Sequence, residues 1–130
     1  MMNDLKSENT ILLVDDEKVV LHVSTLMIKK LGYDVLQAMS GKEASRVFND
    51  NKDDISLVVL DTNLPDELGI ETCRSLKAIR PDVKVLHTSG MGKIQEDHVL
   101  QCGCDQLLSK PFKLKELSDK FKELLDNTYN

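Results

Sequence analysis

The sequence has 130 residues, of which 41% are hydrophobic and 30% charged, and its formal net charge is -5 at pH 7. This length and composition are those of one ordinary globular domain. The negative charge argues against nucleic-acid and membrane partners, which bind basic surfaces, and no apolar run reaches the roughly 18 residues that cross a bilayer, so we expect a cytoplasmic protein.

The first half of the chain alternates between strand and helix patterns. The continuous apolar run at 11–14 predicts a strand buried on both faces. A helix follows and ends at Gly32; its apolar positions at helical spacing are Val20, Val23, Met27 and Leu31. A second strand is predicted at 34–39 and a short helix around 44–48.

The second half continues the alternation. Further strands are predicted at 55–60, 83–87 and 106–108, and further helices at 70–79, 94–102 and 114–124. Five strands alternating with five helices predict an α/β domain whose parallel sheet is covered on both faces. We place this domain at residues 10–127, with polar tails at 1–9 and 128–130.

Cysteine and histidine do not form a recognisable site in this sequence. The three cysteines, Cys73, Cys102 and Cys104, have neither zinc-ligand spacing nor a disulfide framework, which suits a reducing compartment. The three histidines lie in separate predicted elements and share no motif. They are His22, His87 and His98. We interpret the cysteines as small buried thiols and the histidines as core or surface side chains.

Polar residues stand at the carboxyl ends of four predicted strands. They are Asp15 and Asp16 after the first strand, Asp61 after the third, Ser89 after the fourth and Lys110 after the fifth. In a doubly wound parallel sheet these ends meet at one edge, where ligands bind beside the topological switch point. Three carboxylates in one pocket repel each other unless a cation is present, and such a ligand set favours Mg²⁺. The pattern therefore predicts metal and phosphate chemistry.

Four short motifs, each placed after a predicted strand, together resemble the receiver domain of bacterial two-component signalling. They are Leu-Val-Asp-Asp-Glu at 13–17, Leu-Asp-Thr-Asn-Leu-Pro at 60–65 with Gly69, Thr-Ser-Gly at 88–90 and Ser-Lys-Pro-Phe at 109–112. The resemblance extends from residue 10 to residue 126. It implies a flavodoxin-like fold with five helices and a five-stranded parallel sheet of order 2-1-3-4-5.

The resemblance also implies the roles of the acidic residues. Asp61 matches the phosphoacceptor, a carboxylate that attacks phosphorus and becomes an acyl phosphate. Asp15 and Asp16 match the acidic pair that binds Mg²⁺ together with Asp61, and Asp16 is the more direct ligand of the two. The main-chain carbonyl of Asn63 matches the remaining protein ligand.

Two further positions match groups that act on the phosphoryl oxygens. Lys110 matches the cation that pairs with Asp61 and then with the phosphoryl group, and Ser89 matches the hydroxyl that reorients to bond it. Phosphoryl transfer requires this kind of positioning and positive charge. The family usually has a cis peptide bond at the position of Lys110 and Pro111, which aims the ammonium into the pocket.

One position departs from the family pattern. Leu107 stands near the end of the fifth strand, where many receivers carry Tyr or Phe that swings inward on activation. Leucine can change rotamer, but it has no phenolic hydroxyl and less surface to hide. The departure therefore concerns the coupling between Ser89 and the output face, in which Leu107 takes the place of the switch residue. It does not concern phosphorylation itself.

As a function, the resemblance implies a phosphorylation-dependent binding module that catalyses only its own phosphorylation and dephosphorylation. The donor would be a histidine kinase or a histidine phosphotransfer protein, and the output partner is a protein of unknown identity. The motifs look most like receivers of hybrid histidine kinases, while a stand-alone regulator and a phosphorelay intermediate stay open. A homodimer through the fourth and fifth helices also stays open. Because the chain ends soon after the last helix, we expect no output domain.

Two other functions fit parts of the sequence. A pseudo-receiver binds partners without phosphate; Leu107 slightly favours it, whereas the intact acidic residues, Ser89 and Lys110 argue against it. A Mg²⁺-dependent aspartyl-phosphate phosphatase of the haloacid dehalogenase type needs an aspartate two residues after the nucleophile. Asn63 stands there and cannot transfer a proton.

Overall fold

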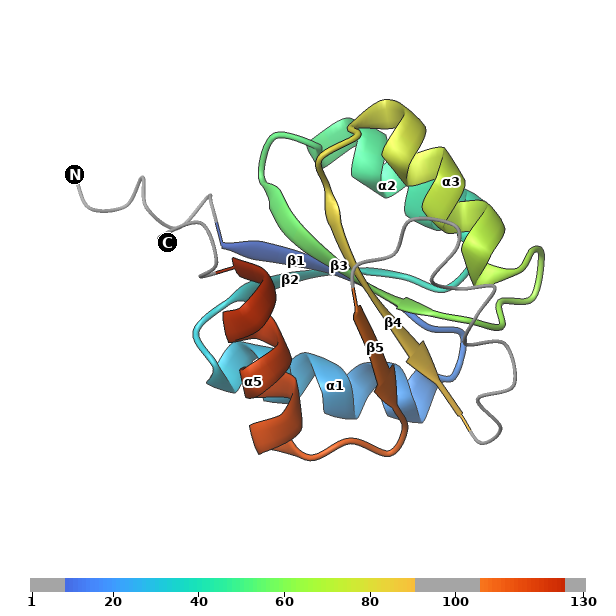
Figure 1. The fold of residues 1–130 in the computed structure, drawn as a ribbon. Helices are drawn as coiled ribbons and strands as arrows, with labels where there is room; N and C mark the ends of the chain where they lie inside the picture. The colour runs from blue at the N-terminus through green and yellow to red at the C-terminus, as the bar shows by residue number, and fades with distance from the viewer. Residues whose placement is uncertain (1–8, 91–105, 126–130) are drawn as a thin grey trace.

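A computed structural model describes residues 9–90 and 106–125, and within them strands and helices alternate as predicted (Figure 1). The strands are β1 (Thr10–Val14), β2 (Asp34–Ala38), β3 (Ile55–Asp61), β4 (Lys84–Ser89) and β5 (Gln106–Ser109). The helices are α1 (Lys18–Lys30), α2 (Gly41–Asn51), α3 (Gly69–Ile79) and α5 (Leu114–Leu125). The helix predicted at 94–102 lies outside the described residues.

All five strands form one parallel sheet in the order β2-β1-β3-β4-β5, which confirms the predicted topology. Helices α2 and α3 cover one face of this sheet, and α1 and α5 cover the other (Figure 1). The chain runs outward in both directions from β1 and β3, so the switch point lies between the carboxyl ends of these two central strands. A ligand crevice is expected at that place.

The central strands are buried on both faces and divide the hydrophobic core into two clusters. On β3, Val58 and Leu60 belong to the cluster under α2 and α3, while Leu57 and Val59 belong to the cluster under α1 and α5. This alternation follows from the two-residue period of a strand. It also explains why the sequence shows continuous apolar runs instead of alternating ones.

The orientation of α1 decides which of its apolar side chains are buried. Leu21 and Ile28 face the core, whereas Val23, one of the positions that predicted the helix, is 47% exposed. Helix α1 carries apolar side chains on two sides, so periodicity fits more than one inward face. Packing against the sheet selects the face with Leu21 and Ile28. The predicted stop is confirmed, since Gly32 has a φ of 101°, a conformation that glycine adopts without strain.

None of the helices within residues 9–90 and 106–125 has both the length and the apolar character needed to cross a membrane.

Candidate metal centre

The polar residues predicted at the strand ends lie together at the carboxyl edge of the sheet. Asp61 and Ser89 prove to be the last residues of β3 and β4 rather than the residues after them, and Asp15 directly follows β1. Lys110 directly follows β5, where its backbone N–H donates to the Ser89 carbonyl oxygen at 2.7 Å. The strands therefore bring the side chains of Asp15, Asp61 and Lys110 together, and β4 ends beside β3 at Ser89.

Three carboxylates form an acidic cluster. Asp15, Asp16 and Asp61 each contribute a carboxylate oxygen, and these oxygens lie within 4.8 Å of one another. Asp15 and Asp61 are buried while Asp16 is exposed, so the cluster has a dry side and a side open to solvent. An all-oxygen set of this size fits Mg²⁺, which binds a few carboxylates and keeps several waters.

Backbone hydrogen bonds hold Asp15 in place. Its Oδ1 accepts from the backbone N–H of Glu17 at 3.0 Å, and its own N–H donates to the Ala38 carbonyl oxygen of β2 at 3.1 Å. The first bond closes the turn that leads into α1, and the second extends the β1–β2 pairing by one residue. The position of this carboxylate is thus set by the sheet.

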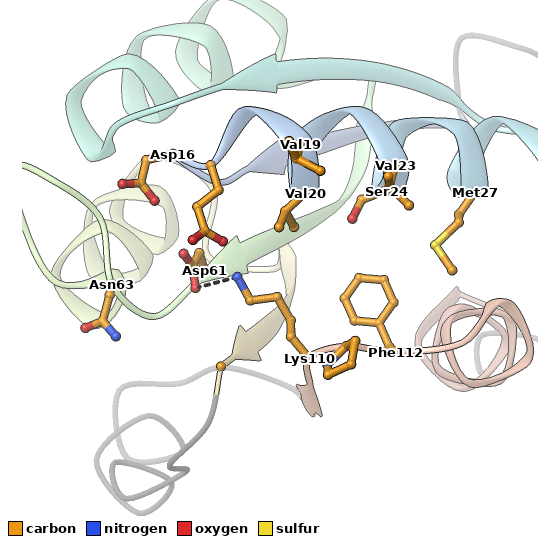
Figure 2. A pocket seen from close by; sticks show the side chains of 13 residues that line it. Asp16, Val19, Val20, Val23, Ser24, Met27, Asp61, Asn63, Lys110 and Phe112 are labelled. Atoms are coloured by element: carbon orange, nitrogen blue, oxygen red, sulfur yellow. Dashed lines mark ion pairs between the residues drawn. The ribbon is translucent and has the colours of Figure 1, made fainter.

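Lys110 reaches into the acidic cluster and contacts two of its members. Its Nζ lies 3.0 Å from Asp15 Oδ2 and 3.4 Å from Asp61 Oδ1, and its side chain is 14% exposed. Figure 2 shows the ammonium pointing at Asp61. The peptide bond between Lys110 and Pro111 is cis. One ammonium therefore bridges two buried carboxylates.

Burial dominates the electrostatics of Asp61. Desolvation raises the pKa of Asp61 from 3.8 to about 6, opposed by Lys110 and by the hydrogen bond from the Asn63 backbone, and reinforced by the negative charge of Asp15. For Lys110, burial lowers the pKa, but the hydrogen bonds and charges of Asp15 and Asp61 outweigh it, so the pKa is raised overall. A divalent cation bound at Asp61 would oppose the rise in its pKa and favour the ionised carboxylate.

The remaining predicted residues lie around this cluster. Asn63 is exposed in the loop between β3 and α3. The hydroxyl of Ser89 donates to the Gly90 carbonyl oxygen at 3.4 Å, a long bond that costs little to break. Leu107 is half-buried, packs against the core cluster under α2 and α3, and pairs in register with His87 of β4.

A groove of about 690 Å³ opens beside Asp61 and Lys110, between α1 and the segment after β5 (Figure 2). Its apolar lining consists of Val19, Val20, Val23, Met27, Pro111 and Phe112. Val19 is 75% exposed. Sequence analysis did not identify this groove. The available signal was the pair of Val19 and Val23, one turn apart on the exposed side of a helix, where polar side chains are usual.

Two polar residues near the site were also missed. Thr62 donates through both its N–H and its hydroxyl to the Thr88 carbonyl oxygen, at 3.0 and 2.9 Å. Asp66 accepts hydrogen bonds from the backbone of α2. The sequence around Thr62 and Asp66 gives no indication of these hydrogen bonds, because their partners lie in β4 and α2.

Curated relatives include both kinases and regulators. A histidine kinase of Formosa agariphila is 34% identical over 128 residues, covering 94% of this chain and 9% of the kinase. The sensor kinase CckA of Brucella abortus is 32% identical, covering 95% of this chain and 13% of the kinase. The phosphate regulon transcriptional regulatory protein PhoB of Pseudomonas aeruginosa is 34% identical, covering 92% and 52%. The chain thus spans from 9% to 52% of the length of these relatives.

Solved receiver structures share the fold. One from Clostridium thermocellum has a TM-score of 0.87 at 27% identity, with 93% of this chain and 97% of that chain covered. The receiver domain of a sensor histidine kinase from Pseudomonas aeruginosa has a TM-score of 0.84 at 26% identity, with 92% and 98% covered. That structure is described as holding a magnesium ion coordinated in its active-site cleft.

The model of one protein family matches most of the chain. This family is the response regulator receiver domain, and the match covers residues 11–122. The matched segment includes β2 to β5, all of β1 except Thr10, and all the residues of the acidic cluster. The chain belongs to the response regulator receiver domain family and is a receiver domain of two-component signalling.

Proposed function

We propose that this receiver domain accepts a phosphoryl group onto Asp61 in a Mg²⁺-dependent reaction. The observation that carries the proposal is the juxtaposition of three carboxylates within 4.8 Å and one ammonium that contacts Asp15 and Asp61. These groups supply a nucleophile, a metal-binding set and a fixed positive charge. Phosphoryl transfer needs all three.

Asp15, Asp16, Asp61 and the main-chain carbonyl of Asn63 are the residues that would hold Mg²⁺. The bound ion would offset the repulsion among the carboxylates and the charge on the phosphoryl oxygens. The magnesium in the similar Pseudomonas aeruginosa receiver supports this assignment. Asp16, as the exposed member, stands on the side from which the ion would enter.

In the reaction, a carboxylate oxygen of Asp61 forms a bond to phosphorus as the bond between phosphorus and the donor nitrogen breaks. The electron pair of that bond stays on the donor imidazole, and Asp61 becomes an acyl phosphate. Lys110 then pairs with a phosphoryl oxygen and keeps its bond to Asp15. Ser89 turns from Gly90 to donate its hydroxyl to another phosphoryl oxygen.

The donor is a histidine of a kinase or of a histidine phosphotransfer protein. Receiver domains of the relatives belong to such systems. The apolar groove beside Asp61 would accommodate the donor domain, because its lining adjoins the nucleophile and exposes Val19 and Val23. Burying these side chains against a partner would stabilise the encounter complex.

The output is a change in protein binding, with Leu107 as the proposed switch residue. Leu107 stands beside β4, whose last residue is Ser89, and packs into the core under α2 and α3. A rotamer change there would follow movement of β4. We propose residues 10–127 as the bounds of the domain that makes this change, with tails at 1–9 and 128–130.

The test is the mass of the intact protein after incubation with Mg²⁺ and acetyl phosphate. Wild type should gain one phosphoryl group, and neither Asp61→Asn nor a metal-free sample should gain it. If no adduct forms, even with a cognate phosphohistidine donor and rapid quenching, the domain is a pseudo-receiver. Release of phosphate from unrelated phosphate esters would instead favour a phosphatase.

A further inference from the structure

The first turn of α2 is bonded to a distant loop. The first three N–H groups of a helix have no partner within its hydrogen-bond ladder. In α2, the Gly41 N–H donates to Asp66 Oδ1 at 2.7 Å and the Lys42 N–H donates to Asp66 Oδ2 at 2.9 Å. The third, of Glu43, donates to the hydroxyl of Ser40 at 3.1 Å. Both oxygens of one carboxylate, in the loop between β3 and α3, thus accept hydrogen bonds from the first turn of α2.

The β3–α3 loop (residues 62–68) is also closed at its base. The Gly69 N–H donates to the Thr62 carbonyl oxygen at 2.8 Å, and Asn63 forms a bridge with Leu68. Thr62 is bonded to Thr88 of β4. The base of the loop is therefore attached to the sheet, and Asp66 attaches its outer part to α2. Asn63 lies between these two attachments.

The two sides of the acidic cluster are connected through this contact. On one side, the Asp15 N–H donates to the carbonyl oxygen of Ala38, which lies three residues before Gly41. On the other side, Asp61 leads directly into the loop that carries Asn63 and Asp66. Hydrogen bonds and short chain segments thus form a closed path around the site.

We propose that Asp66 is a positioning residue of the metal site, which sets the place of the Asn63 carbonyl relative to Asp15 by attaching the β3–α3 loop to α2. The inference rests on the proposed function, in which these groups bind one Mg²⁺. Asn63 is exposed and would otherwise sample more conformations. Ligand groups held in advance bind a metal more tightly than groups that must be ordered on binding.

The fit between loop and helix depends on Gly41. A Cβ atom at this position would overlap the side chain of Glu67, the residue after Asp66. Glu67 in turn accepts a hydrogen bond from the hydroxyl of Thr72 in α3. The absence of a side chain at Gly41 therefore allows the loop to approach the helix closely enough for both Asp66 bonds.

The experiment measures the Mg²⁺ dissociation constant of the full chain by titration calorimetry, well below the melting temperature. Asp66→Ala should weaken Mg²⁺ binding about tenfold, as loss of outer-shell support does in metal sites. Asp66→Asn keeps one acceptor oxygen and should stay within about threefold of wild type. Asp53→Ala, which removes an equal charge from an exposed position just before β3, should bind as wild type does.

A second pair of variants perturbs the other partner of the contact. Gly41→Ala should weaken Mg²⁺ binding as Asp66→Ala does, because the new methyl group pushes the loop away through Glu67. Adding Glu67→Ala should restore binding, since the obstructed side chain is then gone; Glu67→Ala alone is the reference. These variants retain Asp66, so they test the contact even if Asp66→Ala does not fold.

Three results would overturn the inference while leaving the proposed function intact. Wild-type Mg²⁺ affinity in Asp66→Ala would show that the contact supports only the fold. Equal losses in Asp66→Asn and Asp66→Ala, together with a similar loss in Asp53→Ala, would assign the effect to charge. Loss in Gly41→Ala without recovery on adding Glu67→Ala would break the proposed geometry. Failure of the wild type itself to bind Mg²⁺ would instead overturn the proposed function, and the inference with it.

Discussion

The ammonium of Lys110 lies between two carboxylates and is nearer to Asp15 than to Asp61, at 3.0 Å against 3.4 Å. The positive charge at this site is thus shared instead of belonging to the phosphoacceptor alone. Transfer of a phosphoryl group to Asp61 need not break the bond between Lys110 and Asp15. The lysine would remain in place while its second partner changes from a carboxylate to a phosphoryl oxygen.

Removal of this ammonium should slow phosphorylation. We expect Lys110→Ala to lower the rate of phosphorylation by acetyl phosphate about 100-fold, because the developing charge on the phosphoryl oxygens loses a positioned cation. The rate is measured from the mass of the intact protein over time. Lys113→Ala, at an exposed lysine three residues later, is the matched control. An unchanged rate in Lys110→Ala would remove Lys110 from the mechanism.

The pKa of Asp61 predicts how stability depends on pH in the absence of metal. Because burial raises the pKa from 3.8 to about 6, the folded protein binds the proton more tightly than the unfolded chain does. The free energy of unfolding should therefore fall as pH rises from about 4 to 6, by about 1–2 kcal/mol after solvent screening. Urea unfolding in the presence of a chelator measures this change.

The same pH series separates Asp61 from the other acidic residues. Asp61→Asn cannot ionise, so its stability should lack this fall and exceed that of wild type above pH 6. Equal pH profiles for the two proteins would contradict the raised pKa of Asp61. Saturating Mg²⁺ should remove the fall in wild type, since the ion favours the ionised carboxylate.

Asp16 and its neighbour Glu17 allow a test of the metal ligands. Asp16→Asn should weaken Mg²⁺ binding at least about tenfold, because the ion loses a charged oxygen ligand. Glu17→Gln removes the same charge from the next exposed residue and should change the affinity much less. Titration calorimetry measures both. Similar affinities in Asp16→Asn and wild type would refute the assignment of Asp16.

A substitution in the groove beside Asp61 should slow phosphoryl transfer from a protein donor and leave transfer from a small-molecule donor unchanged. Val23→Asp places a charge in the apolar lining, so transfer from a histidine phosphotransfer partner should slow about tenfold or more. Phosphorylation by acetyl phosphate should stay at the wild-type rate. Leu26→Asp is the matched control, because Leu26 is 54% exposed on the same helix and does not line the groove. Equal effects of the two substitutions would argue against docking there.

Much of the fold and of the acidic cluster could be predicted from the sequence. Apolar runs buried on both faces, such as 11–14, mark parallel strands, and parallel strands place their carboxyl ends at one edge of a sheet. Asp15, Asp61 and Lys110 follow or end such runs, so their convergence needs no knowledge of distant contacts. The order of the strands came from the family resemblance and is confirmed.

Other features were decided by the tertiary structure. The sequence left open which side of α1 faces the core, because apolar side chains occur on two of its sides, and only packing against the sheet chooses between them. The unequal distances from Lys110 to Asp15 and Asp61 depend on how β1, β3 and β5 are spaced. The bonds from Gly41 and Lys42 to Asp66 join residues 25 and 24 positions apart, respectively. Local patterns record which residues a strand or helix buries, whereas contacts between elements arise only when packing brings distant segments together.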